Sequence, residues 1–175
     1  MFILTIIVVL LPILVESLSL VLQLKSKKLS RWFGKNAFNI HTTITVIFWI
    51  VAFFSTVILQ FEKHPTLHKS IFLKYTGLIL LISGGVITVW AYKLLGFKRA
   101  LCINFFEDNV PVVETSIYKY FKNPLDIGFW IALIGFALFT KSIYNLVIAA
   151  EFIAIMIPHI ILENIPMSSI PFNRN

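Results

Sequence analysis

A predominantly apolar segment of 36 residues, Ile127–Leu162, most constrains how this chain can fold. As one α-helix it would be about 54 Å long at about 1.5 Å per residue, nearly twice the thickness of a bilayer's hydrocarbon core. Lys141-Ser142, near its centre, is the natural place for a turn. The segment therefore predicts a helical hairpin with arms Ile127–Thr140 and Ile143–Leu162. The first arm is short, so we expect it to be tilted or shielded by its neighbours.

Three further apolar segments precede the hairpin, and each is long enough to cross a bilayer: Phe2–Leu24, Phe38–Phe61 and Ile71–Leu95. The chain is 58% apolar and 13% charged, whereas soluble domains are about 45–50% apolar and about 25% charged. This composition excludes a water-soluble domain, a disordered tail and a disulfide scaffold. We predict an all-α, multi-pass integral membrane protein. Residues 1–175 would form a single transmembrane domain, a polytopic bundle of about five spans that ends in the hairpin.

The basic residues gather in alternate loops. Five Lys or Arg residues lie between the first two spans, five lie at the end of the third span (Lys93) and in the loop before the hairpin (Lys98, Arg99, Lys119 and Lys122), and Arg174 lies in the tail. The opposite side has Lys63, Lys69 and Lys141, with Lys74 just inside the third span. This asymmetry predicts that the first and third loops and the C-terminus are cytoplasmic. It also explains the net charge of +7, so no nucleic-acid partner is expected.

Several familiar catalytic and metal-binding patterns are missing from the sequence. It has no Gly-rich phosphate loop, no H-E-x-x-H and no G-x-S-x-G. The four histidines are not spaced as a metal site, and the single cysteine, Cys102, excludes a disulfide and a cysteine-based zinc or iron–sulfur site. No metal is therefore predicted. His41 and His159 lie near predicted helix ends, and we interpret them as interfacial polar residues.

Two carboxylates, Glu16 and Glu151, fall inside predicted spans, where ionised side chains are costly and often functional. Glu151 could pair with Lys74 by depth. Glu16 could line a cofactor pocket or bond to a neighbouring helix. Small residues in the third span and in the first arm of the hairpin predict close helix crossings: Gly84-Gly85, Gly128, Ala132 and Gly135.

The longest polar stretch, Gly96–Asn123, leads into the hairpin, and we expect residues 96–126 to form a cytoplasmic loop that carries a motif. Its segment Val112–Gly128 brings Tyr, Lys, Asn and Asp to the start of a membrane helix. Pro124 suits the first helical turn, and Gly128 allows a close backbone approach. The free N–H groups of that turn could receive an anion or a carboxylate. An amphipathic segment with snorkelling lysines is the structural alternative.

The same pattern resembles the integral membrane methyltransferases that include isoprenylcysteine carboxyl methyltransferase and the phospholipid N-methyltransferases. Their motif has the form L-V-x-x-G-P-Y-R-Y-x-R-H-P-x-Y-x-G. It follows W-A-x-x-x-L-G and precedes a hairpin whose last helix ends in an acidic pair. The resemblance covers about Trp90–Asn164, and the residues in register are Trp90, Ala91, Leu95, Gly96, Val113, Tyr118, Tyr120, Pro124 and Gly128. It implies S-adenosylmethionine as the methyl donor and a lipid-like or small amphipathic acceptor that enters from the bilayer.

The resemblance also implies the site residues. Cofactor-binding roles fall on Tyr118, Lys122, Asn123, Gly128 and Glu163, and catalytic roles fall on Asp126 and Asn123. The chain departs from the pattern at Ser116, Lys119, Lys122, Asn123, Asp126 and Asn164. These departures leave open a catalytically degenerate relative that serves as a structural or accessory membrane subunit. A third hypothesis, a small transporter or channel component, depends only on Glu16, Glu151 and Lys74.

Overall fold

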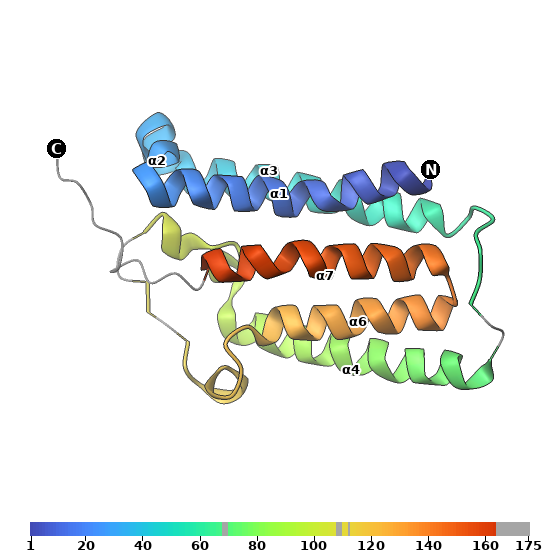
Figure 1. The fold of residues 1–175 in the computed structure, drawn as a ribbon. Coiled ribbons are helices and arrows are strands. Elements are labelled where there is room, and N and C mark those ends of the chain that lie inside the picture. The colour runs from blue at the N-terminus through green and yellow to red at the C-terminus, as the bar shows by residue number, and fades with distance from the viewer. Residues whose placement is uncertain (68–69, 108–109, 112, 164–175) are drawn as a thin grey trace.

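The computed structural model describes residues 1–67, 70–107, 110–111 and 113–163, and the prediction of an all-α bundle is confirmed (Figure 1). Its long helices are α1 (Phe2–Ser26), α3 (Ala37–Leu59), α4 (Ile71–Leu95), α6 (Pro124–Thr140) and α7 (Ile143–Glu163). All but α6 lie in segments that are long and apolar enough to cross a membrane, and α6 is a shorter apolar helix of 17 residues. These helices, together with their composition, are those of an integral membrane protein.

Two segments that the sequence predicts to be loops contain short helices. The basic segment after α1 contains α2 (Lys28–Phe33) and η1 (Gly34–Asn36). The polar stretch before the hairpin contains α5 (Phe97–Ala100), η2 (Ile103–Phe105) and η3 (Ser116–Lys119). Helix α6 begins at Pro124, so the last three residues of the predicted loop 96–126 are helical. Pro124 occupies the first turn because that position needs no N–H donor.

Helices α4 and α6 pack along a row of glycines, as their small residues predict. A Cβ atom on Gly84 would lie 2.4 Å from the backbone nitrogen of Ala132, and one on Gly128 would lie 2.7 Å from that of Thr88. Gly77 and Gly135 make equally close approaches. A Cβ atom on Gly85 would have nothing within 4 Å, so this residue is not part of the contact. The row places the start of α6 against the C-terminal part of α4.

Helix α1 packs on α3 and α7 and completes the bundle. Its buried Ile13 lies in an apolar cluster with Phe152 of α7 and Ala52 of α3. Many apolar side chains are exposed instead, including Ile79 (66% exposed) and Phe72 (73% exposed). Such exposure is expected where the surrounding medium is the hydrocarbon of lipids.

The hairpin turns at Lys141-Ser142, as predicted, with Lys141 in the left-handed conformation (φ 54°). The segment between α3 and α4 crosses this turn, because the N–H of Leu67 donates to Lys141 O (2.7 Å) and that of Ile143 donates to Pro65 O (3.1 Å). The pairing of Lys74 with Glu151 is wrong. Within the described residues no ion pair joins them, and Lys74 Nζ lies 5.8 Å from the centroid of the Phe139 ring.

Candidate active site

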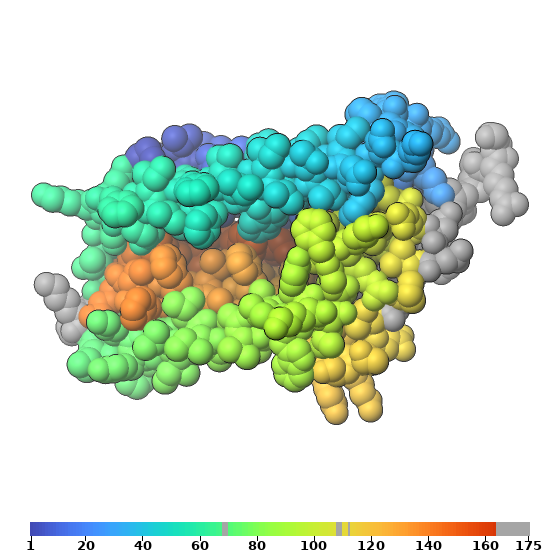
Figure 2. All heavy atoms as spheres, turned by 180° about the vertical axis from the view of Figure 1, so that it is seen from behind, coloured from blue at the N-terminus to red at the C-terminus, as the bar shows by residue number. Residues whose placement is uncertain are grey.

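A cavity of about 890 Å³ lies at the end of the bundle where α1 and α4 end and α6 begins. Its walls come from α1, α3, α4, α6, α7 and the segment between α4 and α6. Figure 2 shows the surface hollowed between α3 and the C-terminal part of α4. This opening follows from the packing, because α4 contacts α6 closely whereas α3 packs on α1.

The cavity has an apolar wall and a polar wall. The apolar wall includes aromatic side chains of several helices, among them Trp49, Phe53, Tyr92, Phe129 and Phe152. The polar wall combines motif residues with groups from α1, α7 and the segment after α4: Glu16, Arg99, Cys102, Tyr118, Lys122, Asn123, Asp126, His159 and Glu163. Ligand sites in proteins are commonly apolar clefts of about 300–1,000 Å³ with a few converging polar groups. This cavity has both properties.

The motif segment is attached to α4 through Tyr118. Its hydroxyl donates a hydrogen bond to Ala91 O (3.3 Å), which joins the two stretches that carry the family resemblance. Ser116, at a position where the family pattern has glycine, adopts a positive φ of 56°. Positive φ is the conformation that glycine accepts most easily. The local backbone therefore keeps the shape that the pattern requires although the residue differs.

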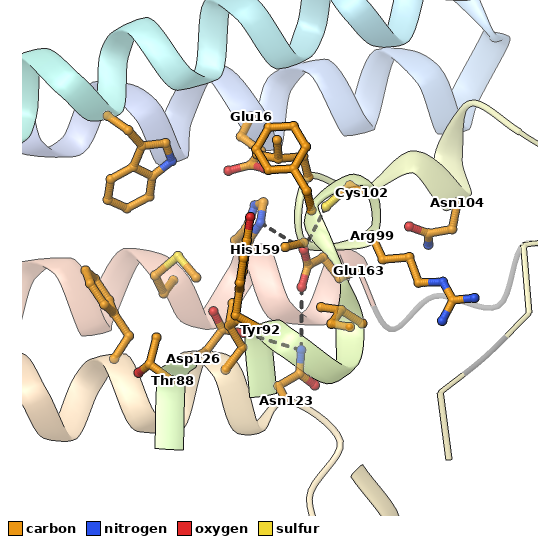
Figure 3. Close-up of a pocket in the computed structure, with 18 of the residues that line it drawn as sticks. Glu16, Thr88, Tyr92, Arg99, Cys102, Asn104, Asn123, Asp126, His159 and Glu163 are labelled. Atoms are coloured by element: carbon orange, nitrogen blue, oxygen red, sulfur yellow. Dashed lines mark hydrogen bonds and ion pairs between the residues drawn. The ribbon is translucent and has the colours of Figure 1, made fainter. Parts of the chain in front are cut away.

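Asn123 connects the start of α6 to the end of α7. Its Nδ2 lies 3.5 Å from Asp126 Oδ2 and 3.5 Å from Glu163 Oε2. Figure 3 shows Glu163 as the meeting point of these groups. The other oxygen, Glu163 Oε1, accepts a hydrogen bond from Cys102 Sγ (2.8 Å) and lies 3.3 Å from His159 Nε2. The last helix therefore faces the motif loop, as the predicted site requires.

The interpretation of His159 as an interfacial residue is wrong. Only 3% of its surface is exposed, and Ser17 Oγ of α1 lies 2.9 Å from its Nδ1. His41 is also buried (3% exposed), beside the Phe106 ring. Both histidines lie in the bundle interior, because neighbouring helices and the segment after α4 cover them.

Two groups outside the spans have shifted pKa values. Burial, followed by the charge of Glu163, raises the pKa of the Cys102 thiol well above its usual range, so the thiol stays protonated. Burial, followed by the charges of Asp126 and Glu163, raises the pKa of Tyr118 to about 12. The phenol is therefore a neutral hydrogen-bond donor at physiological pH.

The structure brings most of the predicted site residues to one cavity. Tyr118, Lys122, Asn123, Asp126 and Glu163 line it. Gly128 lies instead against Thr88 in the α4–α6 contact. The cofactor-binding and catalytic roles of all six residues stay predictions. Asn164, the second position of the expected acidic pair, lies outside the described residues. Glu16 lines the cavity, which is one of the two positions expected for it.

Sequence reasoning missed three contributors to the polar wall, Arg99, Cys102 and His159. The spacing of His159 and Glu163, four residues apart on one helix, was a usable signal for their contact. Cys102 offers no comparable signal, because it reaches the site from a turn far away in the sequence.

Comparison with known protein families shows a match. The profile of the family described as phospholipid methyltransferase matches residues 73–170, more than half of the chain. The matched region contains nearly all of α4, the motif segment and the hairpin, whereas α1 and α3 lie outside it. No curated protein and no solved structure matches the chain significantly.

Proposed function

The chain belongs to the phospholipid methyltransferase family, and from this premise we propose that it transfers a methyl group from S-adenosylmethionine to a lipid-like or small amphipathic acceptor at the membrane. The observation that carries the proposal is the contact of Asn123 with Asp126 and Glu163 at the polar wall of the cavity. This contact joins the motif segment to the end of the last helix, where the resemblance expects the donor.

The polar wall suits the charges of S-adenosylmethionine, which carries an ammonium group, a carboxylate and a sulfonium whose methyl group is already activated for transfer. Glu163 Oε2 would accept a hydrogen bond from the ammonium group. The first-turn N–H groups of α6, which have no partner within the helix, would donate to the carboxylate together with Asn123 Nδ2. Tyr118 and Lys122 lie on the same wall.

The apolar wall suits the acceptor. Trp49, Phe53 and Phe129 line the part of the cavity formed by α3 and α6, and Phe53 is largely exposed on the outer surface of the bundle. An acceptor with an apolar chain would reach the cavity from the bilayer between α3 and α4 (Figure 2). Asp126 is the carboxylate of the motif segment that lines the cavity, and it would receive the proton that an amine acceptor loses on methylation.

The N-terminal helices take part in this proposal although they lie outside the matched region. Glu16 comes from α1, and Trp49 and Phe53 come from α3. We therefore expect these helices to shape the acceptor side of the cavity, while the matched region supplies the donor side.

Substitution of Glu163 tests the proposal directly. A hydrogen bond between charged groups contributes about 1.5–3 kcal/mol. Glu163→Gln should therefore weaken binding of S-adenosylmethionine by roughly 10–150-fold, as measured by calorimetry on the full chain in detergent. Glu151→Gln is the matched control, because Glu151 lies on the same helix and does not line the cavity. It should bind the donor like the wild type.

Two results would contradict the proposal in different ways. Equal binding by the wild type and Glu163→Gln would show that the donor site lies elsewhere. Absence of binding by the wild type at millimolar donor would favour the structural or accessory subunit instead.

A further inference from the structure

Three side chains of metal-ligating types meet at the inner end of the cavity. Glu16 comes from α1, Cys102 from the turn after α5, and His159 from α7. Each offers one ligand atom, and the three atoms lie within 4.8 Å of one another. All three residues are buried, with 6%, 2% and 3% of their surfaces exposed. Figure 3 shows Cys102 and His159 beside the carboxylate of Glu163, with Glu16 on the α1 side of them.

The contacts of His159 leave one ring nitrogen directed at this cluster. Its Nδ1 lies 2.9 Å from Ser17 Oγ, and its Nε2 lies 3.3 Å from Glu163 Oε1. When Nδ1–H donates to Ser17, Nε2 presents its lone pair to the cluster. A hydrogen bond on the far nitrogen is the usual means by which proteins orient a metal-binding histidine.

The cluster contains more acidic groups than cationic partners. Glu16 is more than nine-tenths buried, and within the described residues its carboxylate makes no hydrogen bond and borders the cavity. Glu163 Oε1 has a thiol at 2.8 Å and an imidazole at 3.3 Å. Burial of a carboxylate without a cation or donor is costly. A divalent cation at this point would compensate Glu16 and Glu163 together.

We propose that Glu16, Cys102 and His159 bind a zinc ion, and that Glu163 Oε1 completes the coordination. A thiolate, an imidazole and carboxylates form a ligand set that suits zinc rather than magnesium or calcium. Zinc–sulfur and zinc–nitrogen bonds of about 2.3 and about 2.0 Å place tetrahedral ligand atoms roughly 3.3–3.6 Å apart. The three atoms, which lie within 4.8 Å of one another, would have to move closer together to reach that spacing. The Cys102 thiol releases its proton to solvent when the ion binds.

The ion would cross-link three elements that are far apart in the sequence. It would tie α1 and the turn at Cys102 to the end of α7, and it would hold Glu163 so that Oε2 faces Asn123. This role is structural and does not depend on the methyl donor. The metal site can therefore be tested separately from the proposed activity.

Cobalt substitution gives the sharpest test, because Cys102 is the single cysteine of the chain. The full chain is purified in detergent with a histidine-free affinity tag and titrated with Co²⁺. We expect one equivalent to bind, with a sulfur-to-cobalt charge-transfer band and the visible bands of tetrahedral Co²⁺, and Zn²⁺ to displace it. Elemental analysis of protein expressed with zinc should give about one zinc per chain. A folded wild type that shows neither the charge-transfer band nor bound zinc would overturn the proposal.

Variants assign the ligands. Cys102→Ser should remove the charge-transfer band, and Glu16→Gln should lower zinc retention. Ser17→Ala, which removes the partner of His159 Nδ1, should weaken zinc binding by about 10–100-fold. Glu151→Gln and His41→Gln are matched controls outside the cluster and should retain zinc like the wild type. Equal retention of zinc by Cys102→Ser, Glu16→Gln and the wild type would also overturn the proposal. Circular dichroism on each variant separates loss of metal from loss of fold.

Discussion

The two ends of the bundle differ in how tightly their polar side chains are hydrogen-bonded. One asparagine at each end shows the difference. At the hairpin end, Asn145 is 4% exposed, and its Nδ2 donates to Gln60 Oε1 and Thr140 Oγ1, both at 2.9 Å. Gln60 Nε2 donates in return to Asn145 Oδ1 at 3.0 Å. At the cavity end, Asn123 lies 3.5 Å from each of two carboxylates. Short reciprocal bonds stabilise a fold, whereas long contacts beside a cavity leave room for a ligand.

The two ends of the bundle also differ in whether a segment of the chain covers them. The segment between α3 and α4 crosses the hairpin turn and bonds to it at Lys141 and Ile143. At the other end, the walls of α3 and α4 stay apart and the cavity opens between them. We infer that the hairpin end serves stability and the cavity end serves function. Substitutions at each end test this division.

The largest expected effect concerns which end faces the cytoplasm. Lys35 and Lys63 lie at opposite ends of the bundle, and neither is buried. Because the basic residues favour a cytoplasmic cavity end, Lys63→Cys should react with a membrane-impermeant thiol reagent in intact cells. Lys35→Cys should react only after permeabilisation. The wild type is the blank, since Cys102 is buried (2% exposed).

The reverse pattern of labelling would place the donor side of the cavity outside the cell. The proposed use of a cytoplasmic methyl donor would then fail. Lys63 is a better probe than the hairpin turn itself, because Ser142 is only 1% exposed.

The second prediction concerns the glycine row that joins the two ends. Gly84→Ala would place a Cβ atom 2.4 Å from Ala132 N, and a backbone atom cannot move aside as a flexible side chain can. We expect a loss of about 3 kcal/mol in the free energy of unfolding, the upper part of the usual range for overpacking. Unfolding in mixed micelles, followed by circular dichroism, measures it.

Gly85→Ala is the matched control for this substitution. It lies one residue away in the same helix, and the Cβ atom that it adds would have nothing within 4 Å. It should be neutral or stabilise the helix by up to about 1 kcal/mol. Equal losses at both positions would mean that the close α4–α6 contact does not hold the bundle together.

Much of this fold follows from the sequence because its signals are local. The length of Ile127–Leu162 requires a turn, and Lys141 is the charged residue near its middle. Small residues at helical spacing predict the α4–α6 contact, since only they let backbones approach so closely. The starts and ends of the short helices are less predictable, because they depend on which polar groups find partners after the bundle forms.

The candidate site likewise contains residues that the sequence predicts and residues that it does not. Tyr118, Asn123, Asp126 and Glu163 lie in recognisable positions of a motif, and the structure places all four on one cavity. Cys102 joins them through packing between distant segments, which no spacing rule encodes, whereas the cavity is one of the two places expected for Glu16. The pairing of Lys74 with Glu151 fails for a related reason, because equal depth in a membrane does not put two residues on facing sides of their helices.

The third prediction compares alanine substitutions of the two asparagines, Asn145 and Asn123. Asn145→Ala leaves the buried Gln60 amide without its partner and should cost about 1–3 kcal/mol of unfolding free energy. Donor binding should not change. Asn123→Ala should instead weaken donor binding by up to roughly tenfold, the value of one hydrogen bond of about 0.5–1.5 kcal/mol, with little change in stability. An Asn123→Ala variant that is as unstable as Asn145→Ala would remove the distinction between the ends.

The smallest effect is expected at Tyr118 in alkaline solution. Its folded-state pKa is about 12, above the ordinary value of 10, so the folded chain holds this proton more tightly than the unfolded chain does. The stability that this group contributes is therefore fully present below pH 10 and is lost as the pH rises toward 12. Tyr118→Phe removes this titration, so the melting temperature of the variant should fall less steeply than that of the wild type between pH 10 and 12.

Tyr120→Phe is the control that separates the titration of Tyr118 from that of the other tyrosines and lysines. Tyr120 lies in the same segment but is 77% exposed, so its removal should leave the alkaline slope of the wild type unchanged. At neutral pH, Tyr118→Phe should cost only about 0.5 kcal/mol, because the hydrogen bond to Ala91 O is long at 3.3 Å. Identical alkaline slopes for both variants would mean that Tyr118 is solvated and that the motif segment does not close over the cavity. Since burial, followed by the charges of Asp126 and Glu163, raises this pKa, a shallower slope for Tyr118→Phe alone would show that the phenol is shielded from water on the polar wall where the donor is proposed to bind.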